Sequence, residues 1–329
     1  MAFNRRLFLG SAAAMPLATL AASGARAADV PAGVQTGMAQ FEAVTAQAGG
    51  LIRCHRGQDL QWELGKKAAE PLFVGSAVKT FILAEVLRAV EAGTLSEADQ
   101  WAVNDSVRSL SSPVLINLTG TTTGRSVLEA MIAHSDNTAT DIALAKAGPD
   151  NVRRLIAQAG ATKTLIPHST RRMVSYFAGA PVGKDLSWDE LKKLDTGPQA
   201  GPGRPPMNDR ETMISSAVDL VNWYQTALAG TYFKNPSTLT EFKRIQNMAD
   251  AIAMVVPAGI AAYAKGGSIE WEGFRCFALA GQMVSGPHSV TFSFTINWSG
   301  PNETVAPIFK GYGDAVRLTL AAAIDSLKA

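Results

Sequence analysis

The sequence predicts an α/β (α+β) fold of two lobes, in which an antiparallel sheet flanked by terminal helices carries an inserted all-helical lobe. Strand patterns occur near both ends of the chain, at about 51–64 and 273–298. The stretch between them, from about 76 to 255, has mostly helical patterns. A helical pattern opens the fold at 33–47 and another closes it at 306–327. Strands from both ends are therefore expected to join one sheet.

The domain prediction follows from this order of elements. We expect one domain over 28–329, because strands from both ends of the chain are expected to close one sheet and no internal repeat is visible. Its α/β lobe takes up about 30–72 and 258–329, and its helical lobe takes up about 73–257.

The composition of the 329-residue chain excludes several classes of protein. With 47% hydrophobic and 7% aromatic residues, the chain can bury a large core and is not disordered. Its 30 Lys plus Arg against 28 Asp plus Glu give a formal charge of +2, which is too small and too evenly spread for nucleic-acid binding. Its two cysteines make neither a disulfide-rich scaffold nor a cysteine-based zinc site.

Residues 1–27 are predicted to be a twin-arginine export signal. Arg5-Arg6 precedes an apolar, Ala-rich run without acids, and Ala25-Arg26-Ala27 supplies a small-x-small cleavage site. The apolar run is short of the roughly 20 residues that span a membrane. We therefore expect a periplasmic or secreted protein without a stable membrane span. Removing 1–27 leaves 27 basic and 28 acidic residues, so the mature chain is near neutral.

The elements at the start of the chain have clear boundaries. The helix at 33–47 is expected to close at Gly49-Gly50. Two strands, 51–56 and 60–64, form a hairpin around Gly57. The next segment, 76–92, is apolar nearly all round, which indicates a buried helix ended by Gly93.

Later elements follow the same rules. Ser126 with Glu129 is typical of a capping box before a helix. Further helices are expected at 149–160 and 216–230, and the Gly- and Pro-rich stretch 196–209 is expected to be a loop. In the last strand alternate residues are apolar and are expected to share one face: Val290, Phe292, Phe294, Ile296 and Trp298.

Three short motifs stand in a specific order. They are Ser76-Ala77-Val78-Lys79 at the start of the buried helix, Ser135-Asp136-Asn137 after a helix, and Lys265-Gly266-Gly267-Ser268 on a predicted strand. With these motifs the chain resembles the serine β-lactamase and penicillin-binding protein family, and class A β-lactamases most closely. The resemblance extends to the order of strands and helices over almost the whole mature chain.

The chemistry of Ser76 and Lys79 agrees with this resemblance. Residues three apart on a helix share a face, so the two side chains are neighbours. A serine hydroxyl is a poor nucleophile until a base takes its proton. Lys79 is expected to be that base, provided that burial and a nearby cation such as Lys265 lower its pKa.

The resemblance implies roles for the other motif residues. Ser135 relays the proton to the leaving nitrogen, Asn137 binds the amide side chain of the substrate, and Asp136 orients the loop. Lys265 binds the substrate carboxylate, and the backbone N–H groups of Ser76 and Ser268 form the oxyanion hole. Gly266 and Gly267 let a substrate lie against the strand edge. Neighbouring His134 is expected to be a packed or solvated histidine. No metal and no organic cofactor is implied.

One departure from the family concerns the substrate carboxylate. The family usually has Thr or Ser directly after the strand lysine, where this chain has Gly266. Either Ser268 substitutes for that hydroxyl or the carboxylate is held less tightly. Arg275 on the following strand is either a carboxylate-binding arginine, as in many class A enzymes, or an ordinary surface arginine.

The second departure concerns the base that activates the hydrolytic water. Class A enzymes place a glutamate some 35 residues after the S-D-N motif, but the corresponding segment here, 166–173, contains no acid. His168 within it and the acidic pair Asp189 and Glu190 further on are the candidates for a displaced base. The alternative for the pair is the solvated start of a short helix.

Three functions remain open on this reasoning. The first is a hydrolase that turns over β-lactams through a Ser76 acyl-enzyme, a monomer with small-molecule substrates and a role in antibiotic resistance. The second is a penicillin-binding or sensing protein that is acylated and stalls. The third is a serine esterase or peptidase that uses the same Ser–Lys pair. Cys54 and Cys276 lie on predicted strands, and either form a disulfide or remain two buried thiols.

Overall fold

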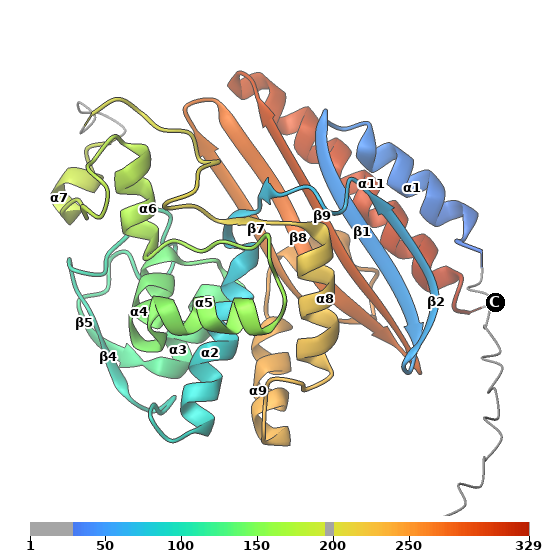
Figure 1. Cartoon of the computed structure of the whole chain (residues 1–329), viewed down its shortest axis with the longest axis horizontal. Helices are drawn as coiled ribbons and strands as arrows, with labels where there is room; N and C mark the ends of the chain where they lie inside the picture. The colour runs from blue at the N-terminus through green and yellow to red at the C-terminus, as the bar shows by residue number, and fades with distance from the viewer. Residues whose placement is uncertain (1–28, 195–200, 329) are drawn as a thin grey trace, which may run out of the picture.

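The computed structural model describes residues 29–194 and 201–328, so the predicted export signal lies outside the described residues (Figure 1). Its central feature is a five-stranded antiparallel sheet in the order β2-β1-β9-β8-β7. The strands are β1 Gln47–Arg56, β2 Asp59–Lys66, β7 Ala261–Trp271, β8 Phe274–Ser285 and β9 His288–Ser299. The prediction that strands from both ends of the sequence share one sheet is confirmed.

Two terminal helices, α1 (Ala32–Glu42) and α11 (Val305–Asp325), cover one face of this sheet (Figure 1). The alternating apolar residues of β9 all face them, as the sequence predicts. Phe294 packs edge-on against Phe41 of α1, with ring centroids 5.2 Å apart. Burial of such large rings supplies the main driving force for this layer.

The first helix ends earlier than its sequence predicts. We expected it to run to residue 47 and to close at Gly49-Gly50, but it ends at Glu42 and both glycines lie within β1. A Cβ on Gly50 would lie 2.9 Å from the ring of Phe41. Gly50 is therefore needed because α1 packs tightly on the strand, which a pattern of helix stop signals does not reveal.

The other face of the sheet carries the helical lobe (Figure 1). Its longest helix, α2, is buried on nearly all sides, as the sequence predicts. The lobe consists of η1 Gly75–Val78, α2 Lys79–Glu91, α3 Gly124–Ala133, α4 Asn137–Ala147, α5 Pro149–Gln158, α6 Thr170–Phe177, α7 Trp188–Leu191, α8 Ala217–Leu228 and α9 Pro236–Gln246. The short helix α10, Ala251–Val255, packs instead against β7 and α11. Short elements complete the fold: β3 Leu72–Phe73 pairs with β6 Ile214–Ser215, β4 Gln100–Val103 pairs with β5 Gly120–Thr123, and η2 is Asn302–Thr304.

The predicted capping box of α3 is wrong. The N-cap is Thr123, whose hydroxyl accepts the backbone N–H of Ser126. Ser126 therefore lies inside the first turn, and Glu129 instead forms an ion pair with Arg244 of α9 (2.6 Å). Thr123 and Ser126 could each cap the helix, and Thr123 does so because β5, which pairs with β4, ends at this residue.

Cys54 and Cys276 are both buried and both free. They lie on β1 and β8, which are separated by β9, and their β9 partners Val290 and Asn297 are seven residues apart in the strand. This separation excludes a disulfide. Burial raises the pKa of the Cys54 thiol to about 11, so the thiol stays protonated.

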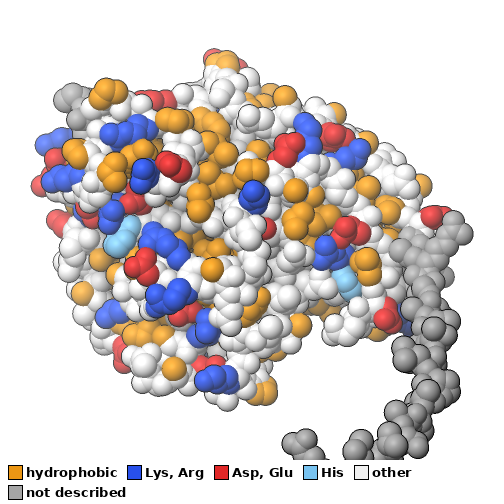
Figure 2. All heavy atoms as spheres, viewed as in Figure 1, with side chains coloured by type: hydrophobic (Ala, Val, Ile, Leu, Met, Phe, Trp, Pro, Cys, Tyr) orange, Lys and Arg blue, Asp and Glu red, His pale blue; other side chains and the backbone are white. Residues whose placement is uncertain are grey.

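No helix of the described chain is long and apolar enough to cross a membrane. On the face shown in Figure 2, acidic and basic side chains are interspersed over the helical lobe.

Candidate active site

Ser76 lies in the 3₁₀ turn that leads into α2, and Lys79 is the first residue of that helix. Gly75 enters the turn with φ = 51°, a conformation that a side chain would strain. Ser76 is half-buried, whereas Lys79 is fully buried. The turn thus holds an accessible hydroxyl one helical turn before a buried amine.

Three polar atoms surround the Lys79 amine. Nζ donates to the backbone carbonyl of Ser135 (2.6 Å) and to Asn137 Oδ1 (2.8 Å), and it lies 3.4 Å from Ser135 Oγ. Asn137 is itself held, because its amide donates to the Leu110 carbonyl (3.0 Å). The first two motifs therefore meet at the lysine amine.

The Lys79 amine is in an environment that disfavours its charge. Its pKa is held well below the usual range, first by burial and then by the positive charge of Lys265, while Asp136 and Asp141 oppose the shift. Lys265 is also buried, and burial lowers its pKa to about 8. A lowered pKa favours the neutral form of the amine, which is the form that can act as a general base.

The Ser135-Asp136-Asn137 loop is shaped by its central carboxylate. Asp136 caps α4 through Ala139 N–H, and its other oxygen accepts the N–H groups of Val114 and Leu115, all at 2.8 Å. Ser135 adopts φ = 59°, which is rare for a residue with a side chain. Asp136 lies where the sequence expected it to orient the loop, and its three bonds hold Ser135 in this strained conformation.

Strand β7 lies directly against the turn that carries Ser76. A Cβ on Gly267 would lie 2.0 Å from the Val74 carbonyl oxygen and 2.8 Å from Ser76 N. A Cβ on Gly75 would lie 3.1 Å from Ser268 N. The two predicted oxyanion donors, the N–H groups of Ser76 and Ser268, are therefore on backbone segments in contact. Gly267 faces this turn, so its lack of a side chain permits the contact, whereas we had expected it to make room for substrate.

Gly266 has a packing reason for lacking a side chain. A Cβ at this position would lie 2.8 Å from Cβ of Ala251, the first residue of α10. The hydroxyl residue that the family places here has no room. Ser268, which was predicted to substitute for that hydroxyl, is exposed two residues further along β7.

Arg275 lies away from Lys265, contrary to one of its two predicted roles. It pairs with Glu270 on β7, five residues beyond Lys265, and it binds the Glu270 carboxylate at 2.8 Å. Its guanidinium also donates to the carbonyls of Gly273 and Gly300 and to Asn302. The alternative prediction, an ordinary surface arginine, is wrong as well, because Arg275 is only 3% exposed. Arg275 fastens the end of the β7–β8 hairpin.

The acidic pair Asp189 and Glu190 lies on α7, at the outer edge of the helical lobe (Figure 1). Glu190 forms a capping box with Ser187, and Asp189 pairs with Lys192 at 2.8 Å. These bonds, and not burial, lower the pKa of both carboxyls. The structure gives both residues the solvated helix-start arrangement that was the alternative reading.

His168 precedes α6 and faces Glu211 and Arg172. Its backbone N–H donates to Glu211 (2.8 Å), and Glu211 pairs with Arg172 (2.9 Å). Partial desolvation and then the charge of Arg172 lower the pKa of the imidazole. None of the contacts described for His168 reaches Ser76 or Lys79.

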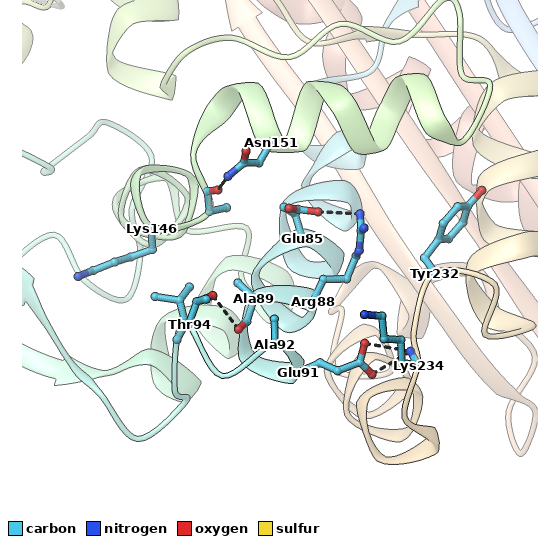
Figure 3. Close-up of a pocket in the computed structure, with 12 residues that line it drawn as sticks. Glu85, Arg88, Ala89, Glu91, Ala92, Thr94, Lys146, Asn151, Tyr232 and Lys234 are labelled. Atoms are coloured by element: carbon cyan, nitrogen blue, oxygen red, sulfur yellow. Dashed lines mark hydrogen bonds and ion pairs between the residues drawn. The ribbon is translucent and has the colours of Figure 1, made fainter.

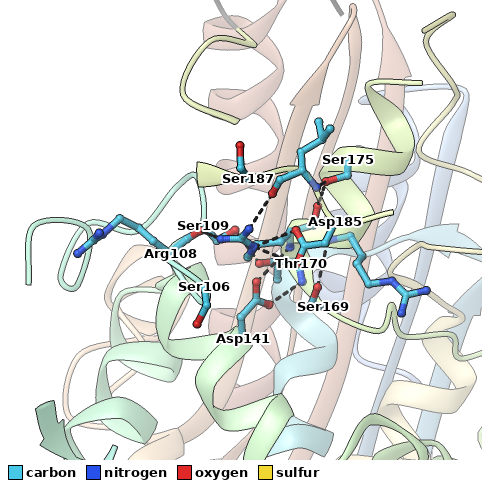
Figure 4. Close-up of polar contacts among 12 residues, drawn as sticks. Ser106, Arg108, Ser109, Asp141, Ser169, Thr170, Ser175, Asp185 and Ser187 are labelled. Atoms are coloured by element: carbon cyan, nitrogen blue, oxygen red, sulfur yellow. Dashed lines mark hydrogen bonds and ion pairs between the residues drawn. The ribbon is translucent and has the colours of Figure 1, made fainter. Parts of the chain in front are cut away.

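Sequence reasoning missed Asp141, a buried carboxylate on α4. It follows Asn137 by four residues, so the two side chains share a helix face. Its oxygens accept the N–H groups of Thr170 (2.6 Å) and Arg171 (3.1 Å), as Figure 4 shows for Thr170. The i, i+4 spacing from Asn137 was the available signal.

One surface cavity of the described chain, with a volume of about 450 Å³, is not at this site. It lies at the C-terminal end of α2, whereas Ser76 precedes the N-terminus of that helix. Figure 3 shows two contacts at this cavity: Arg88 pairs with Glu85 (3.0 Å), and Glu91 accepts the backbone N–H of Lys234 (2.9 Å). Glu85 is the lining residue of α2 nearest to Lys79 and follows it by six residues, so about 9 Å of helix lies between the cavity and the candidate base.

The fold and the three adjoining motifs agree with comparisons to known proteins. The model of the β-lactamase enzyme family matches residues 39–276, and the chain belongs to this family. No relative was found among curated protein sequences.

Solved structures share the fold at low identity. A β-lactamase from Sphaerobacter thermophilus is 20% identical, with a TM-score of 0.67 over 89% of this chain and 96% of that chain. A β-lactamase from Chitinophaga pinensis is 17% identical, with a TM-score of 0.68 over 88% and 99%. A point mutant of PBP-A, in an acyl-enzyme complex with penicillin G, is 15% identical, with a TM-score of 0.65 over 88% and 97%. The predicted family and fold are thereby confirmed.

Proposed function

We propose that this protein opens β-lactam rings by transferring the acyl group to Ser76, as a serine hydrolase of the β-lactamase family. The observation that carries the proposal is the Lys79 amine, which is buried and bonded to Ser135 and Asn137. Lys79 takes the proton of the Ser76 hydroxyl as Oγ bonds to the lactam carbonyl carbon. Ser135 passes the proton to the ring nitrogen as the carbon–nitrogen bond breaks.

The remaining groups would bind and stabilise the substrate. The N–H groups of Ser76 and Ser268 face the developing oxyanion, and Asn137 binds the amide side chain. The Lys265 ammonium attracts the substrate carboxylate, in a site without the hydroxyl that the family has at Gly266.

Slow deacylation is the second part of the proposal. The acids in the described part of 166–211 are engaged with groups other than Lys79: Asp185 with Arg171, Asp189 with Lys192, Glu190 with Ser187, Asp209 with Arg210 and Glu211 with Arg172. This favours a long-lived acyl-enzyme, as in a penicillin-binding or sensing protein. The complex of the PBP-A mutant with penicillin G is an acyl-enzyme on a similar fold.

The test uses the chain without residues 1–27, mixed with a chromogenic cephalosporin and followed by absorbance and intact mass. We expect a stoichiometric burst, a mass increase located on Ser76, and slow turnover. The Ser76→Ala variant should show none of these. Rapid turnover would remove the slow-deacylation part, and absence of any acylation would overturn the proposal in favour of a serine esterase or peptidase.

We also propose export by the twin-arginine route, which rests on Arg5-Arg6 and Ala25-Arg26-Ala27. The protein should appear in the periplasmic fraction of a bacterial host, and replacing both arginines by lysine should retain it in the cytoplasm. Export that is unaffected by this replacement would contradict the route.

A further inference from the structure

Asp141 is a carboxylate inside the helical lobe that the three motifs do not include. It is 4% exposed and lies one turn after Asn137 on α4. Asn137 shares this face of α4 and binds the Lys79 amine through Oδ1 (2.8 Å), and the Asp141 carboxylate raises the pKa of that amine. A buried carboxylate therefore lies one helical turn from a residue that contacts the base of the candidate site.

The hydrogen bonds of Asp141 point to the start of α6. Its oxygens accept the first two N–H groups of that helix, from Thr170 and Arg171, where negative charge is favoured. The Arg171 guanidinium does not pair with Asp141, because it donates to Asp185 and to the backbone carbonyls of Asp105, Arg108 and Leu186. The charge of Lys79 lowers the pKa of Asp141, in the direction opposite to the effect of burial.

The charge of Asp141 makes folding less favourable at neutral pH. Burial raises the pKa of its carboxyl to about 7, and hydrogen bonds and Lys79 only partly oppose this. Ionising the group in the folded protein therefore costs free energy that the unfolded chain does not pay. A carboxylate that is unfavourable for stability but adjoins the base is best explained by an effect on the base.

We propose that Asp141 is a positioning residue whose negative charge stabilises the proton on Lys79 after Ser76 gives it up. The inference rests on the proposed function. As Oγ of Ser76 bonds to the acyl carbon, its proton moves to Nζ and makes an ammonium in a buried place. Asp141 offsets that charge together with Asp136, whereas Lys265 acts against it.

The first test compares wild type with Asp141→Asn, which keeps the shape and removes the charge. As the folded pKa of about 7 lies above that of the unfolded chain, wild type loses stability as pH rises from about 4 to 7. The variant has no such loss. The melting temperature of Asp141→Asn minus that of wild type should therefore increase over this range and level off above pH 7.

The matched control is Asp219→Asn on α8. Asp219 is also buried, and it accepts the Lys163 N–H (2.7 Å) and the Thr164 hydroxyl (3.0 Å), but it is not among the charges that act on Lys79. NMR of protein with labelled lysine side chains gives a readout that needs no activity. The Lys79 pKa should fall in Asp141→Asn and stay unchanged in Asp219→Asn.

The second test measures acylation by a fluorescent penicillin against pH. Without Asp141 the amine is a weaker base, so the plateau rate should fall about tenfold and the acid limb should move to lower pH. Equal Lys79 pKa values in wild type and Asp141→Asn would overturn the inference, as would the same loss of rate in Asp219→Asn. If wild type is not labelled at all, the proposed function fails, while the NMR comparison still decides the inference.

Discussion

Two parts of the chain are predicted to carry the reaction, and they are built differently. The first part is the turn before α2 together with strand β7, and the second part is the segment 166–211. In the first part, backbone lies against backbone at Gly75 and Gly267, and two lysines are buried without an ion pair to any described residue. In the second part, the described acids are satisfied by arginines, lysines and helix caps. In the proposed function, acylation and deacylation would therefore depend on separable structures, of which the described residues display the first more completely.

The largest effect should come from removing the base of the first part. Lys79→Met keeps the apolar stem and removes the amine, so acylation should slow about a thousandfold because Ser76 loses its proton acceptor. The melting temperature should not fall, since burial disfavours the ammonium. The rate of labelling by a fluorescent penicillin gives the measurement, and a rate within tenfold of wild type would refute the assigned role.

A smaller but structural effect should come from Gly267→Ala. The new methyl group would approach the Val74 carbonyl oxygen and Ser76 N too closely, so the unfolding free energy should fall by about 1–3 kcal/mol or more. Acylation should slow with it, because the turn must move.

The matched control is Gly313→Ala on α11, where a Cβ has open space. This substitution should stabilise the protein by roughly 0.5–1 kcal/mol in urea unfolding, because alanine is the better helix former. Equal unfolding free energies of Gly267→Ala and Gly313→Ala would contradict the tight packing of β7 on η1.

Substrate affinity should depend on the charge of Lys265. Its pKa of about 8 means that the ammonium is lost as pH rises above 8, and the attraction for a carboxylate is lost with it. The apparent KM for a penicillin should rise about tenfold for each pH unit above 8. A penicillin methyl ester provides the control and should show no such rise. A flat profile for the free acid would contradict the role of Lys265.

The smallest effect is expected in the second part. Glu190→Gln and Asp189→Asn change exposed carboxylates that are bound to Ser187 and Lys192, so deacylation should stay within about twofold of wild type. Single-turnover decay of the acyl-enzyme, followed by intact mass, measures it. A tenfold slower decay in either variant would make that residue a candidate water-activating base again.

Much of the fold was predictable because its signals are local or periodic. The alternation in β9 placed its apolar face correctly, and the all-round apolar pattern of α2 predicted a buried helix. The failures were at contacts between distant segments. Gly50 was expected to end a helix and instead lies under Phe41, and Arg275 was expected near Lys265 or at the surface and instead fastens a hairpin. Sequence patterns contain no information on which strand position meets which helix.

The candidate site, like the fold, was predictable where its signals are local and not where distant segments meet. The order of the three motifs predicted that Ser76, Lys79, Ser135 and Asn137 act together, and the structure brings the lysine into contact with the last two. The substrate-binding and proton-relay roles stay predictions. Asp141 escaped notice because its i, i+4 spacing from Asn137 is common in helices and does not show which segment the carboxylate binds.

The sequence by itself determined the family and the order of elements, and it predicted the nucleophile and its base, because these depend on residue types at fixed spacing along a helix or strand. Only the tertiary structure decided that Gly266 cannot have a side chain beneath α10, that Asp189 and Glu190 are engaged elsewhere, and that Asp141 binds the start of α6. The physical reason is that steric exclusion, burial and Coulomb interaction act through space. They therefore depend on which segments the fold brings together.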